Sequence, residues 1–158
     1  MNTAPKLGAP WEPKARSYRE SVETSERVFR EYGEALMSRG DFARFFTEDV
    51  LWTTMETGHQ IRGREAVRDY IVALHTTLFD ARPVIRNSAV GESFALLEAD
   101  FVGRHVGEIG GVAPTGKDVA VPYSVVYEID GNRISALRAY FPVAALMGQL
   151  RAEGHVPV

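Results

Sequence analysis

A histidine in a strand-like segment is the first candidate for chemistry in this sequence. His105 has the same strand parity as Phe101 and Gly103, so in an extended strand all three positions face one side. An imidazole titrates near neutral pH and can give or take a proton in an enzyme site. A histidine on an apolar face can equally be a hydrogen-bonded structural residue, so both roles stay open for His105.

Two tyrosines form a second candidate group. Tyr123 and Tyr127 share the strand parity of Val121 and Val125, whereas Glu128 faces the other way. The hydroxyl of a buried tyrosine usually finds a hydrogen-bond partner, and at a pocket it could orient an oxygen of a ligand.

Large apolar side chains could line a pocket for a flat or polyene-like hydrophobic substrate. Ligand pockets are lined mainly by such side chains, with a few polar groups among them. Core packing alone would also explain any single member of the set. The set comprises Phe42, Phe45, Phe46, Trp52, Met55, Tyr70 and Phe101.

The sequence lacks the residues of several common catalytic centres. It has no cysteine, which excludes disulfides, thiolate zinc sites, iron–sulfur clusters and a cysteine nucleophile. No Gly-x-Ser-x-Gly motif supplies a serine nucleophile. The four histidines show no pairing at helical or strand spacing, so we expect neither a metal site nor a cofactor.

A glycine-rich segment has the spacing of a phosphate-binding loop without its chemistry. Residues 111–117 contain Gly111, Gly116 and Lys117 at that spacing, but Asp118 follows where a Ser or Thr would coordinate Mg²⁺. A strand rather than a helix is expected next, so no helix N-terminus would bind an anion. We interpret the segment as a turn between strands.

Length and composition indicate one globular domain. Of the 158 residues, 45% are hydrophobic and 25% are charged, which is average for a packed chain. The net charge of -3 argues against nucleic-acid binding. Apolar runs are too short to span a bilayer, and Pro5 and Pro10 stand where a signal peptide needs an apolar stretch. We therefore expect a cytoplasmic protein without membrane association.

The first half of the chain predicts helices. Residues 1–16 contain three prolines and no periodicity, which is typical of a flexible arm. Apolar spacing predicts one long helix from Ser17 to the Gly40-Asp41 corner and a second from Gly63 to a point before Pro83. Between them we expect a short aromatic helix at 41–46 and an extended segment at 50–55 that turns back at Gly58.

The second half predicts a sheet. Strand-like segments cover 84–90, 93–106, 119–129 and 133–141, and the Asp130-Gly131-Asn132 sequence between the last two is typical of a tight hairpin. A closing helix is expected at 143–150, and 152–158 form a tail. Helices followed by a meander of strands indicate an α+β fold, with one domain over 17–151 and an antiparallel sheet wrapped around the helices.

Several short motifs occur in a characteristic order. They are Gly103-Arg104-His105-Val106-Gly107-Glu108, Ala113-Pro114-Thr115-Gly116-Lys117, Asp130-Gly131 through Ile134, and Leu146-Met147-Gly148-Gln149-Leu150, preceded by Gly40-Asp41, Glu48-Asp49-Val50 and Gly63-Arg64-Glu65-Ala66-Val67. Together they resemble the SnoaL-like polyketide cyclases of the nuclear-transport-factor-2-like superfamily, over about residues 20–151. The resemblance implies a cone-shaped curved sheet closed by helices around an apolar pocket. It also implies a homodimer and cofactor-free ring closure by aldol chemistry.

The sequence departs from this resemblance at one position. Such cyclases carry a general acid/base carboxylate on the last strand, seven residues before the closing-helix glutamine, where this chain has Pro142 before Gln149. The departure weakens the case for the aldol mechanism but not for the fold. It also predicts that Arg138, Tyr140 and Pro142, which alternate on one side of the strand, face the pocket. His105 coincides with a histidine of the family motif.

An arginine inside a pocket would need a partner, because its guanidinium stays charged. Asp100 or Glu56 could pair with Arg138 in a structural ion pair. Alternatively, Arg138 could polarise a carbonyl of the substrate.

We expect a cofactor-free, ring-forming enzyme acting on a hydrophobic, polyketide-like natural-product intermediate. Either His105 with Tyr123 or Tyr140 transfers protons, or the pocket only folds a reactive substrate, as pericyclases of the superfamily do. Alternatives are an isomerase, an epoxide hydrolase with Asp100 and Glu56 around a water, and a non-catalytic binding module. The predicted site comprises His105, Tyr123 and Arg138 as catalytic residues, and Trp52, Met55, Phe42, Phe45, Tyr70, Phe101, Tyr140 and Pro142 as substrate-binding residues.

The last two strands also predict a homodimer. They carry apolar residues on both faces, with Val126 and Leu137 opposite Val125 and Ala136, which is more than a one-sided core requires. We expect a symmetric interface across the outer face of the sheet.

Overall fold

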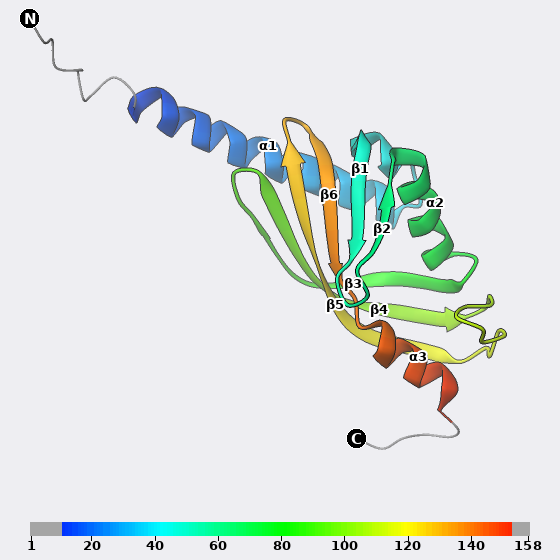
Figure 1. Cartoon of the computed structure of the whole chain (residues 1–158). Helices are drawn as coiled ribbons and strands as arrows, with labels where there is room; N and C mark the ends of the chain where they lie inside the picture. Colours follow the sequence, from blue (N-terminus) through cyan, green and yellow to red (C-terminus); the bar gives the residue numbers. More distant parts are fainter. Residues whose placement is uncertain (1–10, 153–158) are drawn as a thin grey trace, which may run out of the picture.

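The computed structural model describes residues 11–152, with side chains from Tyr18 onward. Residues 1–10 and 153–158, which include much of the expected arm and tail, lie outside the described residues. Three helices and one six-stranded sheet make up the fold (Figure 1). The predicted α+β class is confirmed.

The first helix, α1, spans Trp11–Met37. It begins before the predicted start at Ser17, so the expectation of an arm is wrong for residues 11–16. Pro13 is compatible with the helix because it lies in the first turn, where a backbone N–H needs no helical partner. The helix is closed by a left-handed residue, Arg39, with φ 57°, and by a 2.8 Å hydrogen bond from the Gly40 N–H to the Ala35 carbonyl. The predicted aromatic helix follows as the 3-10 helix η1, Phe42–Phe45.

The second helix, α2, spans Arg64–His75 and is shorter than predicted. The chain leaves the helix at Thr76 and enters strand β3, Phe79–Val90, which runs through Pro83. A proline is tolerated there because β3 is an edge strand, where a missing N–H need not break the ladder.

The other strands are β1 at Phe46–Thr54, β2 at His59–Arg62, β4 at Phe94–His105, β5 at Asp118–Asp130 and β6 at Arg133–Tyr140. Their order in the sheet is β2-β1-β6-β5-β4-β3. All neighbours are antiparallel except β1 and β6, which are parallel, so the expectation of a purely antiparallel sheet is wrong. The sheet is curved around α1 and α2 but not closed (Figure 1).

Buried side chains form two clusters inside this curve. The larger cluster joins α1 and α2 to β1, β4, β5 and β6, and includes Tyr32, Phe46 and Leu137. The smaller one lies under helix α3, Val143–Arg151, and includes Phe79 and Leu146. Half-buried residues pack against both clusters, so the interior is continuous. Within residues 11–152, no helix has the length and apolar character needed to cross a membrane.

Candidate functional site

A cavity of about 40 Å³ remains inside the cone, between α1, α2 and the concave face of the sheet. We call it the inner cavity. A space of this size holds about one water molecule or one small polar group, such as a carbonyl. No carboxylate, lysine or arginine lines it, and its polar side chains are Tyr32, Trp52, His75, Tyr123 and Tyr127.

A groove of about 240 Å³ lies beside the inner cavity, between the end of α1, α2 and the edge strand β3. We call it the outer groove. Leu36, Ile71 and His75 line both spaces and therefore form the wall between them. Met37 and Phe42 extend the apolar surface of the groove.

The tyrosines of the inner cavity are hydrogen-bond donors. Burial raises the pKa of Tyr32 and of Tyr123, and it raises the pKa of Tyr127 well above its ordinary value. All three hydroxyls therefore keep their protons at neutral pH. The rings of Tyr32 and Tyr127 lie 5.6 Å apart between centroids, so two of these donors come from facing elements, α1 and β5.

His75, at the end of α2, is the polar side chain that the sequence-based prediction missed. A carbonyl can only accept, so the Nδ1–H of His75 donates to the Ile71 carbonyl oxygen at 2.7 Å. Its Nε2 is buried and has no hydrogen-bond partner. Burial lowers the pKa of His75 and the charge of Arg39 lowers it further, against the opposing effect of the Ile71 carbonyl. The signal available in the sequence was the four-residue spacing from Ile71 on the apolar face of the helix.

The structure brings three of the predicted site residues together at the inner cavity, namely Trp52, Phe101 and Tyr123. The Trp52 Nε1–H is already used, because it donates to Thr54 Oγ1 at 2.9 Å. Tyr70 does not line the inner cavity but packs against Trp52, with 5.2 Å between their ring centroids.

Phe42 and Phe45, from η1, lie elsewhere. Phe42 lines the outer groove. Phe45 is a core residue, and the Arg44 guanidinium lies 4.7 Å from its ring centroid.

A β-bulge reverses the predicted orientation of β6. The register with β5 shifts between two successive pairs, Glu128–Ala136 and Ile129–Ile134, so Ser135 is an extra residue on β6. The alternation counted from Ile134 is therefore wrong for the rest of the strand. The inner cavity is lined by Leu137, Ala139 and Phe141, and not by the predicted Arg138, Tyr140 and Pro142.

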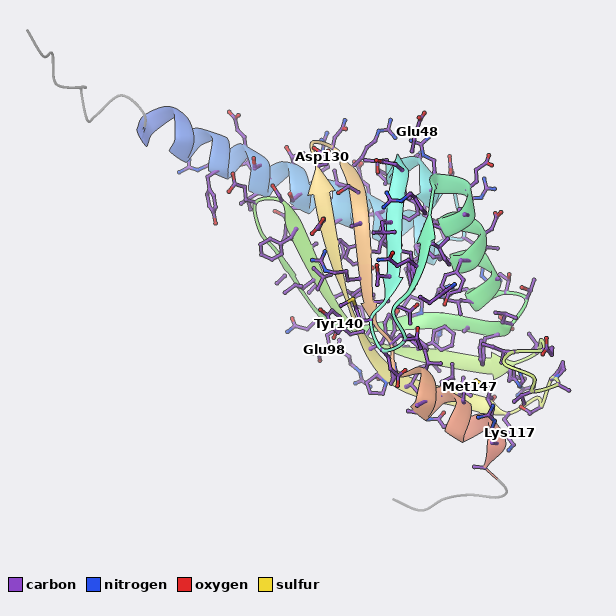
Figure 2. All side chains as sticks on the ribbon, viewed as in Figure 1. Glu48, Glu98, Lys117, Asp130, Tyr140 and Met147 are labelled. Carbon is purple, nitrogen blue, oxygen red and sulfur yellow. The ribbon has the colours of Figure 1, made fainter. Side chains whose placement is uncertain are left out.

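Arg138 and Tyr140 consequently lie on the outer face. Arg138 Nη1 donates to Glu128 Oε1 at 2.6 Å, so the predicted partners Asp100 and Glu56 are wrong. Tyr140 is 50% exposed and lies beside Glu98 (Figure 2).

Pro142 and Met55 do not line the inner cavity. Pro142 is the N-cap residue of α3, where the strand has already ended. Met55 is exposed at the end of the β1 strand, in the turn toward β2.

Neither of the two carboxylates considered for a hydrolase reaches the inner cavity. Asp100 accepts from Arg86 Nε at 2.7 Å on the outer face. Glu56 accepts from the Ala144 N–H at 3.2 Å, at the N-terminus of α3. The expected arrangement of both around a buried water is therefore wrong.

His105 is fully buried at the end of β4 but lines neither the inner cavity nor the outer groove. Its Nδ1 accepts from the Thr115 N–H at 3.1 Å, and its ring centroid lies 5.3 Å from that of Phe79. These contacts hold the loop between β4 and β5 against the core. Of the two roles open for His105, the geometry favours the structural one.

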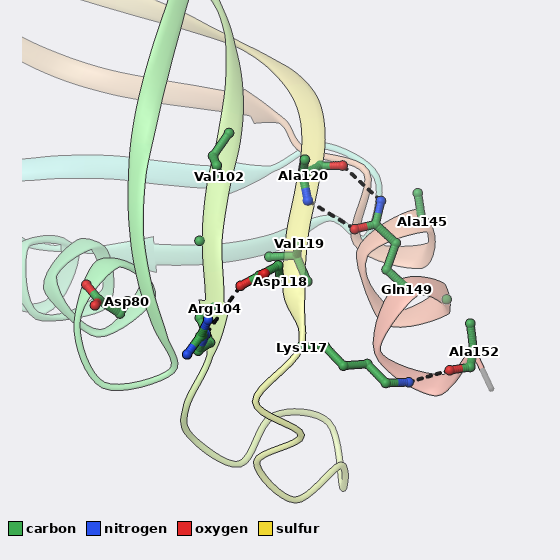
Figure 3. Close-up of a pocket in the computed structure, with 12 residues that line it drawn as sticks. Asp80, Val102, Arg104, Lys117, Asp118, Val119, Ala120, Ala145, Gln149 and Ala152 are labelled. Carbon is green, nitrogen blue, oxygen red and sulfur yellow. Dashed lines mark hydrogen bonds and ion pairs between the residues drawn. The ribbon is translucent and has the colours of Figure 1, made fainter. Parts of the chain in front are cut away.

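A third hollow lies on the surface between β5 and α3 (Figure 3). Its polar groups are already paired. The Gln149 side chain accepts from the Ala120 N–H at 3.1 Å and donates to the Ala120 carbonyl at 2.9 Å, and Lys117 Nζ donates to the Leu150 carbonyl at 3.0 Å. The hollow is open to solvent, and the side chains that line it use their hydrogen bonds to hold α3 against β5. We therefore do not assign a reactive site to it. Across the side chains that the structure describes, no three His, Asp or Glu residues gather as ligands for a metal ion.

Comparisons with solved structures agree with this architecture. A candidate SnoaL-like polyketide cyclase from Jannaschia sp. CCS1 superposes with a TM-score of 0.71 at 19% identity, covering 98% of this chain and 99% of that one. A candidate polyketide cyclase from Xanthomonas campestris pv. campestris gives 0.72 at 14% identity, covering 82% and 98%. A candidate ketosteroid isomerase from Kribbella flavida gives 0.61 at 16% identity, covering 87% and 86%.

None of the curated proteins compared with the chain matches it. The sequence pattern of one family, described as SnoaL-like polyketide cyclase, matches residues 26–150. That match covers most of the chain, including the C-terminal part of α1, all of α2 and all six strands. The chain belongs to the SnoaL-like polyketide cyclase family.

Proposed function

We propose that this protein is a cofactor-free enzyme that closes or isomerises a ring in a hydrophobic, polyketide-like intermediate. Family membership supports the class of reaction. The observation that carries the proposal is a small cavity that no charged side chain lines and that three protonated tyrosines border.

In this proposal the substrate occupies both spaces. The outer groove is large enough for much of a small organic molecule, whereas the inner cavity admits one polar group. A carbonyl oxygen placed there would receive a hydrogen bond from Tyr123, because the Tyr127 hydroxyl already interacts with that of Tyr32. Such a donor stabilises an oxygen more strongly as negative charge develops on it, as in an enolate-like transition state. The walls of the two spaces would also hold the substrate in a conformation suited to ring closure.

A pair of alanines on β6 allows a matched test. Ala139 lines the inner cavity and is 1% exposed, whereas Ala136 lies on the opposite face of the same strand. Ala139→Val should weaken binding of a hydroxyanthraquinone, a planar polyketide-like probe, by about tenfold or more, because the added methyl groups occupy the cavity. Ala136→Val should bind it like the wild type. Calorimetric titration measures both, and equal affinities in the three proteins would refute the assignment.

We also propose that the protein is a homodimer across the outer face of the sheet. Leu137 is 1% exposed and faces inward, so its predicted place in the interface is wrong. Leu96 and Val126, which are register partners on β4 and β5, provide apolar surface on that face together with Tyr140.

Sedimentation should give twice the chain mass of 17.5 kDa. Leu96→Glu should yield the monomer, because it places a charge in the apolar interface. Val72→Glu is the matched control, since Val72 and Leu96 are both 40% exposed but Val72 lies on α2. A wild-type protein that sediments as a monomer at micromolar concentration would disprove the dimer.

A further inference from the structure

The wall between the outer groove and the inner cavity contains one ionisable side chain with a polar atom that has no hydrogen-bond partner. His75 is the last residue of α2, and it lines both spaces. A substrate that occupies both spaces would therefore lie against this ring. Leu36 and Ile71, which complete the wall, are both apolar.

The hydrogen bonds of the ring fix its tautomer. Because Nδ1 donates to the Ile71 carbonyl at 2.7 Å, the neutral ring carries its lone pair on Nε2. That atom is buried and has no partner in the protein. Leaving a buried polar atom unpaired has a free-energy cost, which an apolar side chain at this position would avoid.

We propose that His75 is the general base of this enzyme, acting through Nε2 on a C–H bond beside a substrate carbonyl. The proposal rests on the proposed function and deepens it by naming the substrate class as a carbon acid.

The surroundings keep the ring neutral, so that it is present in its base form at neutral pH. Arg39 at the end of α1 is the charged group that acts on it, and the Arg39 Nη2 is itself paired with Asp80 at 3.2 Å. Phe101 from β4 packs edge-on against the ring, with centroids 5.7 Å apart. The remaining titratable groups that line the inner cavity are the protonated tyrosines Tyr32, Tyr123 and Tyr127, and no acidic residue lines either space.

The proposed step balances without a cofactor. The Nε2 lone pair takes the α-proton, the C–H electrons form the carbon–carbon double bond of an enolate, and the carbonyl π electrons move onto oxygen. That oxygen accepts a hydrogen bond from Tyr123. The enolate carbon then attacks a second carbonyl of the same molecule, whose π electrons move onto its oxygen, and the imidazolium protonates the resulting alkoxide. In an isomerisation, the imidazolium instead returns the proton to a different carbon of the enolate. His75 ends neutral in both cases.

A probe that needs only a base in an apolar site tests the proposal without the natural substrate. Nitrobenzisoxazole loses its ring C–H proton to a base, its N–O bond breaks, and a coloured cyano-nitrophenolate is released. His75→Leu should lower kcat/KM for this reaction by about a hundredfold or more, the range typical of a lost general base. His75→Gln, which keeps a donor for Ile71, should show the same loss if the leucine variant does not fold.

His105 provides a stringent control. It is also a buried histidine with an unpartnered Nε2, but it lines neither space. His105→Leu should change kcat/KM less than about twofold in folded protein. The exposed His59 offers a second control, as His59→Leu.

Two further measurements separate a base from a merely structural ring. The wild-type rate should rise with pH through one ionisation below the ordinary histidine value of about 6.5 and then stay flat, whereas the His75→Leu rate should not show this step. Nitrogen NMR of labelled histidine should find Nδ1 protonated and Nε2 unprotonated at neutral pH.

The outcomes distinguish this proposal from the proposed function. Wild-type elimination no faster than that of His75→Leu, or equal losses in His75→Leu and His105→Leu, would overturn the assignment of the base, even if the probe binding still depends on Ala139. Loss of elimination only in the His75 variants, with anthraquinone binding indifferent to Ala139→Val, would support the base and overturn the role of the inner cavity.

Discussion

Gly103→Ala should destabilise the protein by at least about 2 kcal/mol, because the new methyl group would overlap backbone that cannot move independently. A Cβ at this position would lie 2.4 Å from the Asp80 carbonyl oxygen and 2.5 Å from Ala81 Cβ. Ala81 and Gly103 are register partners, so the clash separates β3 from β4. Since β3 also forms one side of the outer groove, ligand binding should fall with stability. Urea denaturation measures the change in the free energy of unfolding.

Gly148→Ala is the matched control for this substitution. Gly148 lies in α3, and apart from its chain neighbours and the backbone of its own helix no heavy atom comes within 4 Å of the position of its added Cβ. Alanine is a better helix former than glycine, so this variant should gain about 0.5–1 kcal/mol. Similar losses in the two variants would show that Gly103 is not constrained by β3.

Phe101→Ala should cost about 3–5 kcal/mol, as expected for removal of a fully buried aromatic side chain. Phe101 is 1% exposed and belongs to the smaller core cluster, with its ring centroid 5.4 Å from that of Phe79 and 5.3 Å from that of Phe141, which packs against both clusters. It also supports the ring of His75 at 5.7 Å. Thermal and chemical denaturation should both report the loss.

The same strand provides the control. Phe94 lies on the outer face of β4 and is 44% exposed, so Phe94→Ala should change the free energy of unfolding by only about 0.5 kcal/mol. If Phe101→Ala were as mild as Phe94→Ala, the Phe101 ring would not be packed in the core.

Regular strands allowed part of the site to be predicted from the sequence. Alternation along β5 correctly placed Tyr123 and Tyr127 on the inner face, and the aromatic pattern included Trp52 and Phe101. His75 was harder to identify, because its helical spacing shows only that it faces the core. Whether such a ring meets a cavity depends on how α2 packs against α1 and the sheet.

The orientation of β6 could not be obtained from simple alternation. Ile134 and Leu137 are both buried although three positions separate them, which a regular strand cannot achieve. The bulge at Ser135 resolves this conflict, at the expense of turning Arg138 and Tyr140 outward. An odd spacing between large apolar residues was thus the visible sign of the bulge, but the identity of the inserted residue depends on the pairing with β5.

The contact between Gln149 and Ala120 has a consequence for solubility. β6 ends opposite Ser124, so the first residues of β5 have no neighbouring strand on that side. Unpaired backbone groups at such an edge can template pairing with a strand of another molecule, which leads to aggregation. The amide of Gln149 occupies both the N–H and the carbonyl of Ala120, in the way a neighbouring strand would. The closing helix therefore protects the folded protein from edge-to-edge association.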